Sequence, residues 1–351
     1  MSLLESFQKT SITWVLDRGK QTPQHFGNPE LETKTLLEEV ALVDFSHRGA
    51  VSLSGADRAG FLGGLVSNQV KDLKTDRSLY TAMLSPQGRF LWDFTLVDHG
   101  ETILLDTEPD APANLVNSFN FYKMRSKVAI QDASPAFATL GIIGPSATQK
   151  IFELFSVADA DKAPPGATWS LDGNTRLWRD PRHPDFGFRL QCPTSGFTDL
   201  WQRLQTALPC AGHTAWENYR VLKALPRGGS EWQPGETLLL EAGGLEMNAV
   251  SFQKGCYVGQ ETTARTHHRG TLKKRLFRVT IHTQDSLPVL TPLVLRSGKE
   301  AGSISSLASF DGHTQGLALL RLADVVSGEP MTALGHDVSV ARPQWATWEL
   351  P

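Results

Sequence analysis

The 351-residue sequence has few cysteines, no large excess of positive or negative charge, and no long apolar run. Cysteine occurs three times, at Cys192, Cys210 and Cys256, and no C-x-x-C pair is present. A disulfide framework or a self-contained zinc site needs more cysteines at closer spacing, so neither is predicted. The same scarcity indicates a reducing compartment.

The formal net charge is -3, from 34 basic and 37 acidic residues. Without a global positive field, the chain offers no general attraction to nucleic acid or to an anionic membrane. No stretch approaches the ~20 apolar residues of a membrane span. The first twenty residues lack the features of a signal or transit peptide. We therefore expect a cytoplasmic protein that contacts no membrane and does not bind nucleic acid directly.

The length predicts two or three domains, at ~150 residues each. Residues 1–135 indicate a first α+β domain, because helical periodicity alternates there with an antiparallel meander of strands. Residues 136–275 indicate a second α+β domain that ends in the stretch around Cys256. Residues 276–351 consist of short β runs broken by glycine, which is typical of a small barrel. The expected fold class is α+β with a C-terminal β barrel.

One order of elements occurs twice along the chain. Both "VSLSGADRAGFLGGLV" and "LGIIGPSATQKIFELF" predict a strand, a glycine, a cap and a helix, with Gly144 in the place of Gly55. Asp57 is expected to cap the helix that follows Gly55. This echo indicates a duplicated α+β module.

The stretch "KGCYVGQETTAR" contains Cys256, with Lys254 two residues before it. Glycines at 255 and 259 predict a tight loop that leads into a short helix. A thiolate is the reactive and metal-binding form of cysteine, and a nearby cation or helix N-terminus favours it. Spacing alone leaves two interpretations with equal weight, a reactive group and a small buried hydrophobe.

Other chemistries have less support in the sequence. His267 and His268 follow Cys256, but a cysteine protease needs a histidine base with an orienting partner, and none is indicated. "ARTHH" after one cysteine matches no zinc or iron spacing. One cysteine can still be one ligand of a site shared between two proteins. The basic run from Arg265 to Arg278 has no aromatic stacking residues around it, so a solvated linker is favoured over an RNA-binding surface.

Asp93 stands in the apolar strand pattern "LWDF", so its side chain is expected to point inward. A buried carboxylate is either paired with another group or offered to a ligand. Asp93 is therefore a candidate binding residue.

The segment "FQKGCYVGQETTARTHHRGTLKKRL" resembles the signature of the YgfZ family, folate-binding proteins related to the glycine cleavage T protein. The family pattern, close to K-G-C-Y-x-G-Q-E followed by A-R, is matched through Lys254, Gly255, Cys256, Tyr257, Gly259, Gln260, Glu261, Ala264 and Arg265. Other stretches, such as "LVDFSHRG", "SPQGRFLWDFTLV" and "LPRGGSEWQPGETLLLE", also resemble T-protein-like chains. The likeness runs from about residue 31 to about residue 341.

The resemblance implies a T-protein (aminomethyltransferase-like) fold, in which two α+β units and a C-terminal β barrel surround a central folate pocket. It also implies a factor that assembles or repairs iron-sulfur clusters in target enzymes, including radical enzymes that modify tRNA. The implied ligand is tetrahydrofolate or a derivative, and the implied partners are iron-sulfur assembly proteins and client enzymes. Cys256 would be one ligand of a transient cluster shared with a partner, or a redox thiol, with Lys254 favouring its thiolate.

The implied folate contacts come from separate parts of the chain. Asp93 would face the pterin, and Arg125 or Arg227 would meet the glutamate tail by charge-assisted hydrogen bonds. Around the thiol, the implied binding residues are those of the motif itself: Tyr257, Gln260, Glu261 and Arg265.

Two departures separate the chain from the T protein itself. Where the T protein has two acids, this chain reads "GRFLWDF", so Asp93 remains and Trp92 replaces the other acid. Where the T protein has an acidic stretch for its ligand, this chain reads "PDFGFRL", with Arg189 in place of a glutamate. The loss of carboxylates weakens the case for proton transfer at the folate nitrogen. A tetrahydrofolate-dependent aminomethyltransferase is therefore the alternative, and a non-enzymatic assembly factor is favoured.

Overall fold

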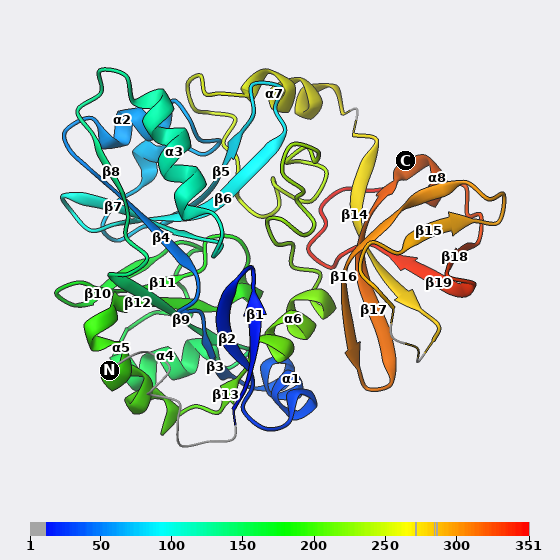
Figure 1. Cartoon of the computed structure of the whole chain (residues 1–351), viewed down its shortest axis with the longest axis horizontal. Coiled ribbons are helices and arrows are strands. Elements are labelled where there is room, and N and C mark those ends of the chain that lie inside the picture. Colours follow the sequence, from blue (N-terminus) through cyan, green and yellow to red (C-terminus); the bar gives the residue numbers. More distant parts are fainter. Residues whose placement is uncertain (1–11, 271, 284, 286, 351) are drawn as a thin grey trace.

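The computed structural model describes residues 12–270, 272–283, 285 and 287–350. Two units built on β-sheets lie on one side of the molecule and a β barrel lies on the other (Figure 1). In the described part of the chain, no helix combines the length and the apolar character that crossing a membrane requires.

The first unit is a five-stranded antiparallel sheet in the order β5-β6-β7-β4-β8, accompanied by two helices (Figure 1). Its elements are β4 (Gly49–Ser54), α2 (Arg58–Gly63), the 3-10 turn η2 (Val70–Asp72), β5 (Leu79–Leu84), β6 (Phe90–Asp98), β7 (Thr102–Thr107), α3 (Pro112–Lys123) and β8 (Ala129–Asp132). The predicted meander is confirmed, because β6 pairs with both β5 and β7. Asp57 precedes α2 but does not cap it, because its carboxylate accepts the N–H of Lys127 at 2.7 Å instead.

The second unit is a six-stranded sheet in the order β10-β11-β12-β9-β3-β13. Its elements are β3 (Ala41–Asp44), β9 (Phe137–Ile143), α4 (Ala147–Phe155), β10 (Thr168–Asp172), β11 (Thr175–Arg179), the 3-10 turn η3 (Pro184–Phe186), β12 (Phe188–Pro193), α5 (Thr194–Gln205) and β13 (Cys210–Ala211). Strand β3 pairs with β9, although it precedes the whole first unit in the sequence. This sheet therefore draws residues from both segments predicted as domains, 1–135 and 136–275.

Gly55 and Gly144 have the same role in the two units. Each follows a strand and has a positive φ, 105° and 131° respectively. A Cβ would lie 2.3 Å from the carbonyl oxygen of Lys127 at Gly55, and 2.4 Å from that of Glu39 at Gly144. A neighbouring backbone thus approaches both glycines too closely for any side chain. The repeat in the sequence corresponds to one local geometry built twice.

The N-terminal elements lie where the three bodies meet (Figure 1). They are the hairpin strands β1 (Thr13–Asp17) and β2 (Lys20–His25) and the helix α1 (Pro29–Glu38), which packs on α6 (His213–Leu222). Asn28 caps α1, since its side chain accepts the N–H groups of Glu30 and Leu31. Two residues separate α1 from β3.

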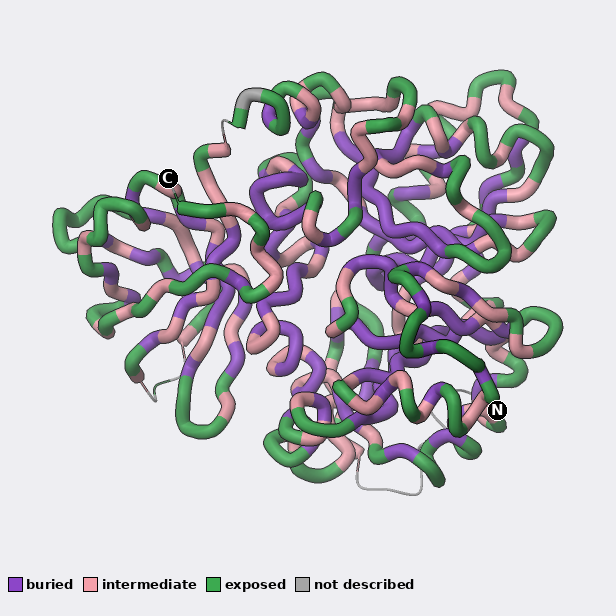
Figure 2. Tube along the Cα trace, turned by 180° about the vertical axis from the view of Figure 1, so that it is seen from behind, coloured by how far each residue is buried: buried purple, intermediate pink, exposed green. Residues whose placement is uncertain are grey.

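The C-terminal body is a closed barrel in the order β14-β17-β16-β15-β18-β19, which confirms the predicted barrel. Its elements are β14 (Lys274–Ile281), β15 (Pro292–Leu295), β16 (Glu300–Phe310), β17 (His313–Arg321), α8 (Leu322–Val326), β18 (Met331–Ala333) and β19 (His336–Ala341). Buried residues alternate with more exposed ones along several barrel strands (Figure 2). Closure leaves the barrel without a free sheet edge.

The largest cluster of buried apolar side chains among the described residues lies between the bodies. It joins Trp216 and Tyr219 of α6 to Trp232 in the irregular segment after that helix, and to Leu276 and Leu317 of the barrel. Buried aromatic rings contribute most of the apolar area in such a cluster. This shared core fixes the three bodies around their junction.

Candidate functional site

Cys256 lies in an exposed loop that leads into α7 (Gln260–Arg269), as the sequence predicts. Gln260 orders this loop, because its Oε1 accepts the N–H of Tyr257 at 3.0 Å while its Nε2 lies 3.9 Å from the Cys256 sulfur. The interpretation of Cys256 as a small buried hydrophobe is therefore wrong.

The other two cysteines are in a different environment. Burial raises the pKa of the Cys192 and Cys210 thiols to about 12, so both stay protonated at neutral pH. Since the thiolate is the nucleophile and the metal ligand, Cys256 is the accessible candidate of the three.

Backbone hydrogen bonds fasten the Cys256 loop to the first unit. The N–H of Ser251 donates to the carbonyl oxygen of Ser67 at 3.1 Å, and the N–H of Val258 donates to that of Gly64 at 3.2 Å. These bonds lie on both sides of Cys256, so the exposed thiol has a defined position on the surface.

Lys254 anchors the same loop through its side chain. Its ammonium donates to the carbonyl oxygen of Gly63 at 2.9 Å and to that of Val66, and it lies 4.5 Å from the centre of the Tyr257 ring. Burial lowers the pKa of Lys254 to about 8. None of these contacts involves Cys256. The geometry makes Lys254 a support for the loop rather than a cation aimed at the sulfur.

Two glycines let the turn between β5 and β6 pack against the start of α7. Gly259 has a φ of 82°, and a Cβ there would lie 2.4 Å from the carbonyl oxygen of Ser85. A Cβ on Gly88 would lie 2.6 Å from the Cβ of Thr262. Neither position has room for a side chain, so the turn and the Cys256 loop hold each other in place.

The exposed face of α7 is polar. The side chains of Glu261 and Arg265 are exposed and form no hydrogen bond or ion pair with another described residue. The His267 ring stacks on Phe252 with centroids 3.9 Å apart. Within the described ranges, no contact joins a histidine to Cys256, so the protease hypothesis gains no support.

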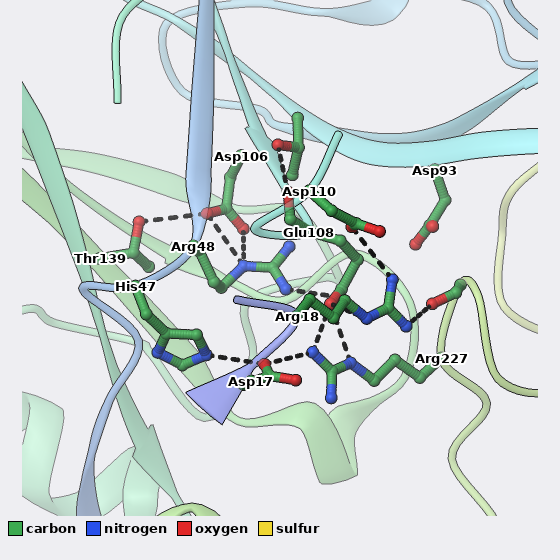
Figure 3. A network of polar contacts seen from close by, with 12 residues as sticks. Asp17, Arg18, His47, Arg48, Asp93, Asp106, Glu108, Asp110, Thr139 and Arg227 are labelled. Atoms are coloured by element: carbon green, nitrogen blue, oxygen red, sulfur yellow. Dashed lines mark hydrogen bonds and ion pairs between the residues drawn. The ribbon is translucent and has the colours of Figure 1, made fainter. Parts of the chain in front are cut away.

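A second polar region, which we call the central charge network, lies at the junction of the three bodies, and Figure 3 shows the part of it around Arg48, Glu108 and Arg227. Its residues form buried or half-buried ion pairs and are Asp17, Arg18, Arg48, Asp106, Glu108, Asp180, Arg182, Arg189, Glu217, Arg220, Arg227 and Glu231. They come from the N-terminal hairpin, both sheet units, α6 and the segment after it, so the network ties distant parts of the chain together.

Asp93 lies beside the central charge network and is buried, as predicted (Figure 3). Its carboxylate accepts the hydroxyl of Tyr80 at 2.7 Å. Burial raises the pKa of Asp93, and the charge of Glu108 raises it further. Gly228 packs so closely that a Cβ would lie 1.9 Å from the Asp93 carboxylate. This carboxyl is enclosed and paired.

The two arginines predicted for a glutamate tail lie in different places. Arg227 donates to Asp17 and to Glu108, both at 2.6 Å, and to Glu217 at 3.3 Å. Arg125 is exposed after the end of α3 and does not line the central cavity. Neither presents a free guanidinium at the centre.

The cavity inside the central charge network is small. Its volume is about 20 Å³, whereas pockets that bind small molecules measure about 300–1,000 Å³. Arg189 lines this cavity. Its guanidinium lies 3.9 Å from the centre of the Phe45 ring and 3.4 Å from the carboxylate of Asp180. Charged and aromatic side chains of the chain itself line this small cavity.

Comparisons with known proteins agree with this architecture. Residues 7–254 match the model of the GCVT N-terminal domain, and residues 273–348 match that of the CAF17 C-terminal beta-barrel domain. The solved glycine cleavage system aminomethyltransferase T from Bartonella henselae aligns with a TM-score of 0.84, covering 98% of this chain and 97% of that one. Its 16% sequence identity means that the likeness shows the fold alone.

The sequence relatives are named for one process. The iron-sulfur cluster assembly factor IBA57, mitochondrial, of Mus musculus is 31% identical over 78% of this chain and 75% of the relative. The protein of the same name from Homo sapiens is 30% identical over the same shares. A homolog from Pyricularia oryzae is 30% identical over 85% of this chain and 77% of the relative. The chain belongs to the GCVT-like iron-sulfur cluster assembly factors.

Membership of the GCVT-like assembly factors confirms the fold and the general function that the Cys256 motif implied. The predicted cytoplasmic location is wrong, because these relatives are mitochondrial. Low cysteine content and modest net charge describe any reducing compartment, so composition could not separate the two locations.

The central charge network of this GCVT-like assembly factor was not predicted from sequence patterns. Arg220 offers the clearest signal, because it follows Trp216 by four residues and so shares the buried face of α6. A charge at such a position predicts a buried partner. The identity of the partner, Glu231, depends on how the next segment folds back.

Proposed function

We propose that the protein supplies the Cys256 thiolate as one ligand of an iron-sulfur cluster that it shares with an assembly partner. The supporting observation is that Cys256 is exposed yet alone. Among the described residues, one group of three possible metal ligands lies close together, and Cys256 is not part of that group. Iron-sulfur clusters are held by several cysteine thiolates, so the other ligands must come from a second protein.

The surroundings of Cys256 suit a shared site. The loop is fixed by the backbone bonds of Ser251 and Val258 and by the ammonium of Lys254, so little ordering entropy is lost when a partner binds. The exposed charges of Glu261 and Arg265 on α7 offer polar contacts at the rim of such an interface. The proposed clients are iron-sulfur enzymes, including radical enzymes that modify tRNA. The YgfZ-like motif around Cys256 supports this choice of clients.

Mixing the protein anaerobically with an assembly protein that carries a cluster should give a complex whose visible absorption differs from that of the partner alone. The reason is that a new thiolate ligand alters the charge-transfer bands of iron. Gel filtration with absorption detection measures this change. Cys256→Ser should lose the difference, and the matched control Cys210→Ser should keep it. Identical absorption and iron content with Cys256→Ser would contradict the proposal.

Tetrahydrofolate or a derivative is a separate proposal, with Asp93 facing the pterin. In the described arrangement the ligand would have to open buried ion pairs such as those of Arg227, and breaking one costs about 3–5 kcal/mol. We therefore expect calorimetric titration to show binding near millimolar concentration that Asp93→Asn weakens. No heat and no thermal shift at millimolar ligand would refute folate binding. The same enclosed geometry of Asp93 gives the aminomethyltransferase alternative no support.

A further inference from the structure

The small cavity inside the central charge network has a wall that is rich in arginine. The arginines and carboxylates that line it are Arg48, Arg182, Arg189, Arg220, Arg227, Asp17 and Glu108. The other acids of the network bond to these arginines but do not line the cavity. The wall therefore presents more positive than negative charge to the space inside, which favours an anion over a cation.

Both carboxylates of the wall already have cations as partners (Figure 3). Oδ2 of Asp17 accepts from Arg227 at 2.6 Å and lies 3.0 Å from Nε2 of His47. Glu108 accepts from Arg48 at 2.7 Å and from Arg227 at 2.6 Å. Because the negative charge of the wall is held in these pairs, little of it is left to repel an anion.

Arg189 is the lining arginine whose charge is least compensated. Its ion-pair partner, Asp180, lies 3.4 Å away and is shared with Arg182, which donates to the same carboxylate at 2.7 Å and 2.9 Å. Burial and the charges of Arg182 and Arg48 lower the pKa of Arg189 to about 10, although the charge of Asp180 opposes this shift. The pKa of each other lining arginine is raised, because the attraction of its carboxylate partners exceeds the cost of burial. An anion beside Arg189 would supply the missing countercharge.

Nitrogen atoms without partners belong to two residues of the same wall. The side chain of Arg189 is 3% exposed, its Nη1 is buried, and no described residue accepts a hydrogen bond from either of its terminal nitrogens. The rings of Phe45 and Trp216 cover the guanidinium, with centres 3.9 Å and 5.3 Å away. Nδ1 of His47 is also buried without a partner, and it donates when the ring is protonated. Buried polar atoms without partners are uncommon and call for an explanation.

The size of the cavity limits the occupant to a very small one. Its volume is about 20 Å³, whereas one water molecule needs about 10–15 Å³ on this measure. A single-atom ion therefore fits. A water molecule also fits, but it has no charge and would leave the buried charge of Arg189 without compensation.

We propose that this cavity binds one small monovalent anion of the size of chloride, with Arg189 as its main partner. The anion would stabilise the junction of the three bodies, because the lining residues come from the N-terminal hairpin, both sheet units and α6. The site is distinct from Cys256 and does not depend on its role in cluster assembly.

Thermal unfolding of the full chain tests the proposal, with chloride as the probe. Sodium chloride replaces sodium gluconate at constant ionic strength, because gluconate is too large for the cavity. The unfolding midpoint should rise by about 2–4 °C for each tenfold increase in chloride above the dissociation constant. An unchanged midpoint up to molar chloride would overturn the proposal and leave water as the occupant.

Two arginine variants locate the effect. Arg189→Met should lose the response to chloride, because it removes the uncompensated charge while Asp180 keeps Arg182. Arg342→Met, which removes a surface pair with Glu349, should keep the response. A response that Arg189→Met retains would show that the ion binds elsewhere and would overturn the proposal.

A measurement on the unchanged protein places the ion without any substitution. Crystals grown with bromide in place of chloride should show an anomalous scattering peak in the cavity, next to the Arg189 guanidinium. Bromide at exposed positions alone would identify an adventitious ion only, and the proposal would then be wrong.

Discussion

Cys256→Ser should fail to restore a cluster-dependent enzyme in cells that lack the protein, although the variant folds normally. Serine keeps the shape of the side chain but offers no thiolate to iron. The thiol is exposed, and its contact with Gln260 is a weak one at 3.9 Å. Exposed substitutions of this kind change the free energy of unfolding by about 0.5 kcal/mol or less. Enzyme activity should fall to the level of cells without the protein, at equal abundance of the variant.

Two further substitutions show which role of the Cys256 thiol explains that loss of activity. Cys210→Ser should restore activity fully, because the pKa of this buried thiol is raised to about 12 and it offers no thiolate. Cys256→His should restore activity in part if Cys256 is a cluster ligand, since histidine replaces cysteine at some cluster irons. A redox thiol has no such substitute. Full rescue by Cys256→Ser would refute any role for the sulfur.

Arg220→Met should lower the free energy of unfolding by about 3–5 kcal/mol, the largest stability effect that we expect. The Arg220 side chain is 2% exposed and donates to Glu217, Glu231 and Ser306. Methionine fills much of the same space but leaves the carboxylate of Glu231, which is 0% exposed, without its cation. An unpaired buried charge is costly because the surroundings cannot solvate it. Urea unfolding at pH 7 measures the change.

A matched arginine provides the control. Arg342→Met removes an ion pair with Glu349 at the surface, and such pairs contribute about 0–1 kcal/mol. The double variant Arg220→Met/Glu231→Gln should recover part of the lost stability, because it removes the unpaired charge as well. Equal losses of unfolding free energy in Arg220→Met and Arg342→Met would show that burial of the ion pair does not control stability.

Local elements could be predicted because their signals act over a few residues. The meander of β5, β6 and β7, the helix after Cys256 and the barrel strands all follow from periodicity and turn residues that stand next to one another. Strand β3 could not be assigned to its sheet in this way. Its short apolar pattern fits either sheet, and its pairing with β9 depends on a segment far along the chain.

The chemical role of each candidate residue depended on burial and pairing. The motif around Cys256 identified the family, since it depends on a contiguous run of residues. The exposure of Cys256, the use of Lys254 as an anchor and the small size of the central cavity became visible in three dimensions. Arg227 and Asp17, which are 210 residues apart, form one such buried pair. Local sequence patterns do not encode such a contact, because it exists when the whole chain has folded.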